Sequence, residues 1–181
     1  LPGVVTTSVG YAGGEKTNPT YYEVCSGLTG HSEVVRVIWD KSKIDISDLL
    51  KMFWECHNPT QKNRQGNDIG TQYRSAIYFK EENNKEIILS SKEQYQKELN
   101  EKNLGLIQTE IKLIDTYYYA EEYHQQYLAL EGSRQYCSAS PTKIRLGEFS
   151  GSNYKLKDNI WRNFNWEVDK CVLRSDNNPI N

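Results

Sequence analysis

Hydrophobic and polar residues alternate along several short stretches of the chain, and this two-residue period predicts β-strands. Residues 4–11 form the first stretch, which ends in the glycine-rich turn 10–14. Residues 33–40 form the second, and because apolar side chains fall on both of its faces, we expect a central strand there. Two further strands are predicted at 74–79 and 108–114.

Helical periodicity occupies the intervals between these strands. Asp45, with Asp48 three residues later, predicts an N-cap and a helix that packs on the sheet and ends near His57. Its apolar positions recur at helical spacing, at Ile46, Leu49, Leu50, Phe53 and Trp54. Residues 81–103 predict a charged surface helix, and residues 120–130 a shorter one. The alternation of strands and helices is typical of a layered α/β domain.

Two regions lack a regular period. Residues 60–72 are rich in Gln, Asn, Gly and Asp, which is typical of an ordered or a functional loop. Residues 142–181 are mostly polar but contain Trp161, Phe164 and Trp166. We expect this second region to wrap around the domain or to be partly disordered.

Length and charge narrow the class of protein. The 181 residues suit about one domain, and the net charge of −2, without a long basic run, argues against a nucleic-acid-binding protein. No apolar run reaches the roughly 20 residues of a membrane-spanning helix, and no signal-peptide segment is visible. Because the chain starts at Leu1 and Met52 is its one methionine, we expect that a segment ahead of Leu1 is missing.

The cysteines are few and scattered. No two of them form a C-x-x-C pair, and a chain of this length does not need disulfides to build a core. Isolated thiols suit a reducing compartment, where each is either an inert core residue or a reactive group. They are Cys25, Cys56, Cys137 and Cys171.

Glu33 is the first candidate for chemistry. It shares a predicted strand face with Val35 and Val37, and a carboxyl group desolvated among apolar side chains has a raised pKa. Such a group can donate a proton near neutral pH. The alternative is an exposed Glu33, or one paired with Arg36 or Arg74.

Other reactive side chains lie in the loops that flank these strands. Tyrosine hydroxyls there can donate hydrogen bonds to a substrate oxygen, or the rings can simply pack on the sheet; these tyrosines are Tyr11, Tyr21, Tyr22 and Tyr73. Side chains of metal-binding type are also present, but without an H-E-x-x-H or C-x-x-C spacing we predict no metal site. They are His31, Glu33, His57, Asp68 and His124. No G-x-S-x-G motif supports a serine hydrolase.

Six segments, read together, identify a family. They are Val9-Gly10-Tyr11-Ala12-Gly13-Gly14, Asn18-Pro19-Thr20-Tyr21, Glu23-Val24-Cys25-Ser26-Gly27, Thr29-Gly30-His31-Ser32-Glu33-Val34-Val35, Arg64-Gln65-Gly66-Asn67-Asp68-Ile69-Gly70-Thr71-Gln72-Tyr73-Arg74-Ser75-Ala76-Ile77-Tyr78 and Tyr119-Ala120-Glu121-Glu122-Tyr123-His124-Gln125-Gln126-Tyr127. They closely resemble peptide methionine sulfoxide reductase A over residues 1–137.

The resemblance implies an α/β sandwich with a mixed β-sheet flanked by helices, a ferredoxin-like core and an irregular C-terminal tail. We expect a methionine sulfoxide reductase A-like domain over 1–140 and a polar tail over 141–181. The implied activity is reduction of methionine S-sulfoxide, either free or in oxidised proteins. We expect a monomer located in the cytoplasm, with a mitochondrial or plastid location as the alternative. No bound cofactor is implied, and thioredoxin or dithiothreitol serves as the external reductant.

The resemblance also assigns roles to residues. In the family, a cysteine thiolate attacks the sulfoxide sulfur while a glutamate, here Glu33, protonates the oxygen. Tyr21 and Tyr73 match the two tyrosines that hold this oxygen, and Asp68 and His124 match a pocket carboxylate and a histidine near the substrate. Cys137 occupies the place of the cysteine that resolves the resulting sulfenic acid to a disulfide, which thioredoxin then reduces.

Two features depart from the family pattern. The family's Gly-Cys-Phe-Trp-Gly motif, which carries the attacking cysteine, does not occur in these residues, and Ser138-Ala139-Ser140 replaces a glycine-rich run. We therefore expect the 181-residue chain to be inactive by itself. The alternatives are a non-catalytic module that binds sulfoxide or thioether side chains and a truncated product that folds poorly.

Overall fold

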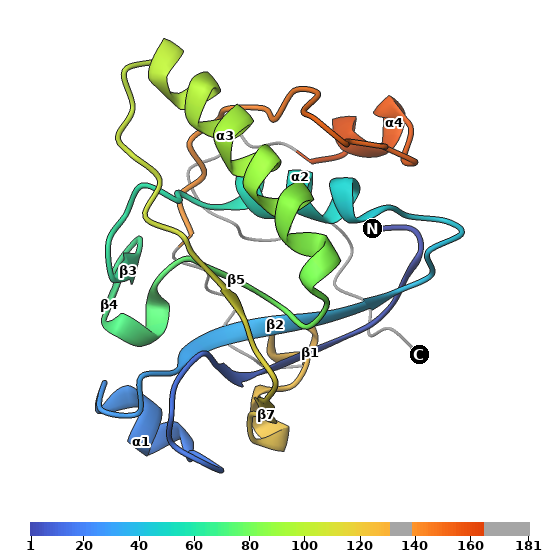
Figure 1. The fold of residues 1–181 in the computed structure, drawn as a ribbon. Helices are drawn as coiled ribbons and strands as arrows, with labels where there is room; N and C mark the ends of the chain where they lie inside the picture. The colour runs from blue at the N-terminus through green and yellow to red at the C-terminus, as the bar shows by residue number, and fades with distance from the viewer. Residues whose placement is uncertain (131–138, 165–181) are drawn as a thin grey trace.

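The main sheet is antiparallel and carries Tyr11 and Glu33, two of the candidate site residues. The computed structural model describes residues 1–130 and 139–164 (Figure 1). Strands β1 (Val4–Ala12), β2 (Ser32–Trp39) and β7 (Tyr117–Tyr119) form a three-stranded sheet in the order β2-β1-β7. The register places Tyr11 of β1 between Glu33 of β2 and Tyr118 of β7. Residues about 20 and 100 positions apart along the chain are thereby brought side by side.

The prediction that residues 33–40 form a central strand is wrong, because β1 takes the centre of this sheet. Gly10 explains why β7 can approach β1 so closely: a Cβ at this position would lie 2.2 Å from the carbonyl oxygen of Tyr118. The apolar side chains on both faces of β2 are not all buried, since Val35 is 60% exposed. Apolar residues on two faces were therefore not a sign of burial on two faces here.

A second, parallel pair of strands completes the α/β character. β5 (Ala76–Phe79) pairs in parallel with β6 (Glu110–Leu113), and α3 (Lys85–Glu101) makes the crossover between them after a 3-10 turn at Glu82–Asn84. The predicted α/β class is confirmed. Among the described residues, the antiparallel and parallel pairings belong to separate sheets rather than to one mixed sheet.

Helix α2 (Ile46–Cys56) forms as predicted and organises the larger core. Asp45 caps it, the Asp48 side chain accepts the Asp45 N–H at 3.0 Å, and the helix ends before His57. Trp54 is fully buried, stacks on Tyr95 of α3 and donates its indole N–H to the Ser91 hydroxyl at 2.9 Å. In Figure 1, α2 and α3 occupy the upper part of the molecule, while β1 and β2 run below them.

The helix predicted at 120–130 does not form. The structure instead has two 3-10 turns, Glu122–His124 and Tyr127–Ala129. Between them Gln126 adopts a left-handed conformation with φ 52°, which interrupts any continuous helix. The aromatic run before this region forms β7, which the sequence analysis did not predict.

Residues 139–164 lie along α2 and contribute to its core. Leu146, Phe149 and Trp161 are buried, the last of them in the short helix α4 (Asp158–Arg162). Two fully buried carboxylates of α2 hold this segment by its backbone. Asp48 accepts the N–H groups of residues 155 and 156, and Glu55 accepts that of Leu146 at 2.9 Å. Of the predicted tail, the described part therefore wraps around the domain.

The remaining short elements lie on the left side of Figure 1, a short helix at the bottom and a two-stranded hairpin at mid-height. Helix α1 (Tyr21–Cys25) follows the first glycine-rich turn. The expected loop 60–72 is ordered: β3 (Arg64–Gln65) and β4 (Asp68–Ile69) form a two-stranded hairpin, followed by a 3-10 turn at Thr71–Tyr73. Both short segments carry candidate site residues.

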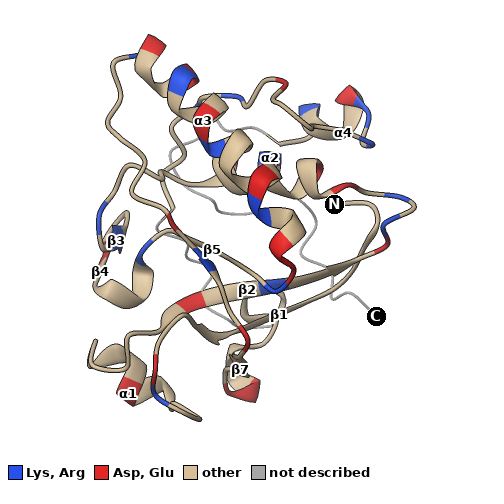
Figure 2. Cartoon of the chain, in the orientation of Figure 1, with Lys and Arg blue, Asp and Glu red and all other residues tan. Residues whose placement is uncertain are grey.

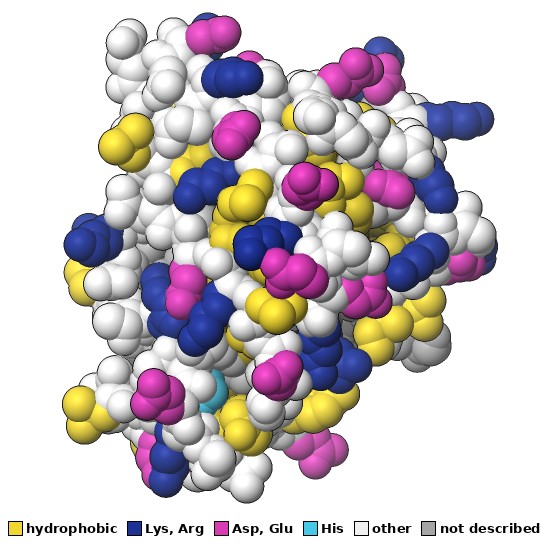
Figure 3. Space-filling view, viewed as in Figure 1, with side chains coloured by type: hydrophobic (Ala, Val, Ile, Leu, Met, Phe, Trp, Pro, Cys, Tyr) yellow, Lys and Arg dark blue, Asp and Glu magenta, His cyan; other side chains and the backbone are white. Residues whose placement is uncertain are grey.

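The surface carries both signs of charge. Figure 2 shows acidic and basic residues interspersed along α3, and Figure 3 shows small groups of hydrophobic side chains between charged ones on the same face. In residues 1–130 and 139–164, no helix has the length and apolarity needed to cross a lipid bilayer.

Candidate active site

The structure brings together five of the six predicted site residues, each from a different short element. Tyr21 begins α1, Glu33 lies in β2, Asp68 lies in β4, Tyr73 ends a 3-10 turn and His124 ends another. The negative charge of Glu33 acts on both tyrosines, and that of Asp68 acts on Glu33. The sixth residue, Cys137, lies outside the described residues.

The sequence around Tyr21 explains its fixed position. Thr20 and Glu23 form a reciprocal capping box, in which Glu23 accepts the Thr20 N–H at 2.9 Å. This box starts α1 at Tyr21, whose ring packs against His124 with centroids 4.8 Å apart. The sequence analysis predicted neither this cap nor the helix, although Thr20 with Glu23 three residues later is a capping-box spacing that could have indicated both.

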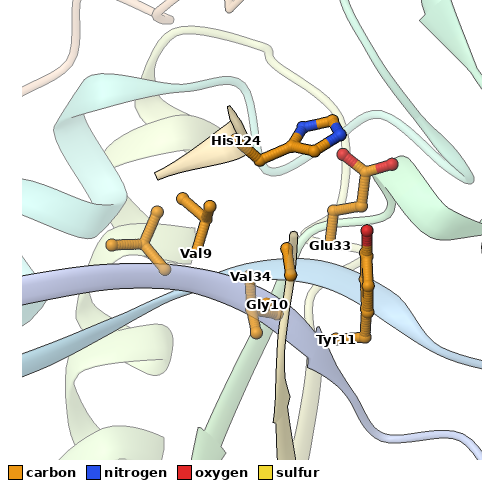
Figure 4. A pocket seen from close by; sticks show the side chains of 8 residues that line it. Val9, Gly10, Tyr11, Glu33, Val34 and His124 are labelled. Atoms are coloured by element: carbon orange, nitrogen blue, oxygen red, sulfur yellow. The ribbon is translucent and has the colours of Figure 1, made fainter. Parts of the chain in front are cut away.

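A hollow of about 230 Å³ lies between β1, β2 and the turn at Glu122–His124. Figure 4 shows the imidazole of His124 and the carboxyl group of Glu33 pointing toward one another on one side of it. Apolar and small residues form much of the remaining lining, which consists of Val9, Gly10, Tyr11, Val34, Val35 and Ala120. A small ligand with a polar end and an apolar body fits such a lining.

The environment of Glu33 favours its neutral form. The side chain as a whole is exposed, yet the protein around its carboxyl group excludes enough water to raise its pKa to about 7. The negative charges of Asp68 and Glu121 contribute to this value and act in the same direction as burial. Since burial and like charge agree in sign, a substantial fraction of Glu33 carries a proton at neutral pH.

The predicted alternative for Glu33, an ion pair with Arg36 or Arg74, is not formed in the described structure. Arg74 pairs instead with Glu110 at 2.7 Å, and Arg36 donates to the Tyr119 hydroxyl at 3.0 Å. Neither arginine therefore holds Glu33 in its ionised form in the described structure.

The two candidate tyrosines are held in their neutral, hydrogen-bond-donating form. A hydrogen bond with Cys25, followed by burial, raises the pKa of Tyr21 well above its ordinary value. Burial, followed by the charge of Glu33, raises the pKa of Tyr73. Of the other two tyrosines considered, Tyr11 is buried, whereas Tyr22 is 81% exposed and contacts the Tyr21 ring edge-on.

Glu121 belongs to the site but received no role in the sequence analysis. Its carboxylate accepts the Tyr11 hydroxyl at 2.7 Å and the backbone N–H of Tyr21 at 2.8 Å. Burial opposes ionisation of Glu121, but these hydrogen bonds outweigh it and lower the pKa. No local pattern marked this residue, because both partners are about 100 positions away in the sequence.

The other histidines have structural contacts. His31 accepts the Gly14 N–H at Nδ1 and donates from Nε2 to the Lys16 carbonyl at 2.7 Å. His57 donates to the Phe53 carbonyl and accepts from Ser75, and burial lowers its pKa to about 4 despite the first of these bonds. Across the described ranges, no three His, Cys, Asp or Glu side chains converge as a metal site would require.

Two of the four cysteines fall within the described residues, and these two form no disulfide there. Cys25 is exposed at the end of α1, beside Tyr21, and Cys56 lies in the last turn of α2 with its thiol 3.5 Å from the Phe53 carbonyl. Neither lies on the hollow.

Comparison with known proteins gives a consistent result. Residues 1–155 match the family model described as peptide methionine sulfoxide reductase. The chain is 56% identical over 144 residues to the peptide methionine sulfoxide reductase MsrA of Pseudomonas entomophila, a match that covers 80% of this chain and 64% of that protein. It is 52% identical over 144 residues to MsrA 1 of Synechocystis, again over 80% of this chain and 64% of the relative. The chain thus spans less than two thirds of these relatives.

Two solved structures share the fold. Methionine sulfoxide reductase A of Corynebacterium diphtheriae is 42% identical with a TM-score of 0.66, over 80% of this chain and 73% of that one. The reduced form of Mxr1 from Saccharomyces cerevisiae is 32% identical with a TM-score of 0.65, over 81% of this chain and 80% of that one.

Proposed function

Because the chain belongs to the peptide methionine sulfoxide reductase family, we propose that it provides the substrate pocket and the proton donor for thiol-dependent reduction of methionine S-sulfoxide. The substrate is the free amino acid or an oxidised methionine in a protein. One observation carries the proposal: a carboxyl group with a pKa of about 7 lies beside two phenols that remain neutral.

The phenols bind the sulfoxide oxygen. Tyr21 and Tyr73 each carry one O–H donor, and a sulfoxide oxygen accepts two hydrogen bonds. On binding, the Tyr21 O–H exchanges its hydrogen bond with Cys25 for one to the ligand. Negative charge grows on this oxygen as the sulfur is attacked, so preorganised donors stabilise the transition state more than the ground state. Asp68 and Glu121 support the site indirectly, since their charges keep Glu33 protonated.

The proton of Glu33 is used in the attack step. A cysteine thiolate bonds to the sulfoxide sulfur while Glu33 protonates the oxygen; the oxygen then passes to the cysteine sulfur and the thioether is released. The substrate sulfur gains two electrons and the thiol becomes a sulfenic acid. Protonation makes the substrate sulfur more electrophilic, which is why a neutral carboxyl group suits this position.

We assign the attacking thiol to none of the cysteines in this chain. Cys25 and Cys56 lie off the hollow, and the Gly-Cys-Phe-Trp-Gly motif is not among the 181 residues. Cys137 remains our prediction for the resolving thiol, with thioredoxin or dithiothreitol as the external reductant. The cytoplasmic location and the monomeric state are likewise still predictions.

The 181-residue chain should bind the sulfoxide but not reduce it. We expect saturable shifts in the NMR signals of Tyr21 and His124 on titration with N-acetylmethionine (S)-sulfoxide, and no methionine product in the presence of dithiothreitol. The R-epimer serves as the matched control ligand and should bind more weakly. Turnover by this chain would contradict the proposal that none of its cysteines is the attacking thiol. The absence of any change in the NMR signals would contradict the proposed substrate pocket.

The pKa of Glu33 provides a separate test of the proton donor. We expect its carboxyl group to titrate at about 7, so that the donating form is present below this pH and lost above it. Asp68→Asn removes a neighbouring negative charge and should lower the pKa toward the ordinary value of 4.5. Carbon-13 NMR of the Glu33 carboxyl group measures its pKa in the parent chain and in the Asp68→Asn variant. Asp115→Asn is the control, because Asp115 is exposed and does not act on Glu33; an unshifted Glu33 in the parent chain would refute the proposal.

A further inference from the structure

The side-chain amide of Gln125 continues the strand pairing of β1 where β7 ends. The register between β1 and β7 stops at Gly10 and Tyr119, after which the Ala120 N–H still reaches the Val9 carbonyl at 3.1 Å. The chain then turns away. From this turn, Gln125 accepts the Val9 N–H at 2.9 Å and donates to the carbonyls of Val9 and Ala120, each at 3.0 Å. One side chain thus satisfies the backbone groups that a further strand residue would satisfy.

This amide fixes the residue directly before it. His124 lies on the same 3-10 turn, closed by its own N–H to the Glu121 carbonyl at 2.9 Å. Its ring lies between Tyr21 and Tyr123, with centroid distances of 4.8 and 4.4 Å. The turn that Gln125 attaches to β1 therefore carries a histidine on one side of the hollow, as Figure 4 shows.

The His124 ring has one nitrogen atom that makes no hydrogen bond in the described structure. Its Nε2 atom is buried and has no hydrogen-bond partner among the described residues. A buried polar atom without a partner costs free energy, so a site that keeps one in a pocket is suited to a ligand that supplies the partner. The ring lies beside the Glu33 carboxyl group on one side of the hollow, so a ligand bound in the hollow would lie next to this ring (Figure 4).

The same turn also positions Tyr21. Glu121 at its start accepts the Tyr21 N–H at 2.8 Å, and His124 at its end packs on the Tyr21 ring. Displacement of the turn from β1 would therefore move the histidine and the tyrosine together.

We propose that Gln125 is a positioning residue, which pairs with the backbone of β1 and thereby holds His124 Nε2 and the Tyr21 ring in register with Glu33. The inference rests on the proposed function only for the role of these groups toward the sulfoxide. The placement of the turn can be tested without any ligand.

Gln125→Glu is the test variant, because it keeps the shape and the acceptor but puts a carboxylate oxygen opposite two carbonyl groups. We expect it to abolish the nuclear Overhauser contacts between the His124 and Tyr21 rings and to weaken binding of N-acetylmethionine (S)-sulfoxide about tenfold. Gln126→Glu is the matched control. Gln126 is exposed, and its amide donates to Thr7 at 3.2 and 3.4 Å rather than to the Val9 backbone, so this change should leave both readouts as in the parent.

Three outcomes separate the possibilities. If Gln125→Glu keeps the His124–Tyr21 contacts and the affinity, the positioning role is refuted. If the contacts are lost while the parent itself binds no sulfoxide, Gln125 does position the ring pair and the proposed function fails. If the variant does not fold, exchange of the Val9 amide proton in the parent decides: protection supports the bond to Gln125, and rapid exchange overturns it.

Discussion

Glu33→Gln should lower turnover about a thousandfold when it is introduced into a chimaera that carries the family's Gly-Cys-Phe-Trp-Gly segment ahead of Leu1. The amide is isosteric with the carboxylic acid but too weakly acidic to protonate the sulfoxide oxygen. Binding should survive, because Tyr21 and Tyr73 still donate to that oxygen. The measurement is kcat and KM for reduction of N-acetylmethionine (S)-sulfoxide with dithiothreitol, and we expect the loss in kcat.

The pH profile distinguishes a proton donor from a structural residue. In the chimaera with Glu33, the rate should fall as the pH rises through about 7, because the donating form is lost. In the Glu33→Gln chimaera this decline should vanish along with most of the rate. Glu93→Gln on the exposed surface of α3 is the control and should change neither. A Glu33→Gln chimaera with near-parental kcat would disprove the assignment.

Glu55→Gln should destabilise the fold by about 3 kcal/mol, the largest effect on stability that we predict. Glu55 is fully buried and accepts Lys51 at 2.6 Å, Arg145 at 2.7 Å and the Leu146 N–H at 2.9 Å. Glutamine keeps the volume but removes the negative charge that the largely buried Lys51 ammonium group and the Arg145 guanidinium group both contact. Urea unfolding at pH 7, monitored by tryptophan fluorescence, gives the free energy of unfolding.

An exposed ion pair provides the comparison for Glu55. Glu82 accepts Lys85 at 2.8 Å, and both side chains are more than half exposed. Glu82→Gln should change the free energy of unfolding by no more than about 0.5 kcal/mol, since solvent screens such pairs. Equal effects of the two substitutions would show that Glu55 does not anchor residues 145–146 to α2.

Local patterns predicted the elements whose signals lie within a few residues of one another. The capping residues and apolar spacing of α2 placed that helix correctly, and alternation located β1, β2, β5 and β6. The short motifs that carry the family resemblance pointed to five candidate site residues, and the structure brings these five around one site. They are Tyr21, Glu33, Asp68, Tyr73 and His124. Helix 120–130 was wrong because its local propensity was overridden by the bonds of Gln125 to Val9, 116 positions away.

The sequence by itself named the candidate site residues and predicted most of the elements that present them, because side-chain type, helix caps and strand periods act over short distances. Only the tertiary structure decided that β1 is central, that Glu121 holds Tyr11 and Tyr21, and that Glu55 holds Arg145. Each of these depends on a contact between groups far apart in the chain. The proton affinity of Glu33 belongs to the same class, since its pKa is set by burial and by the charges that folding places beside it.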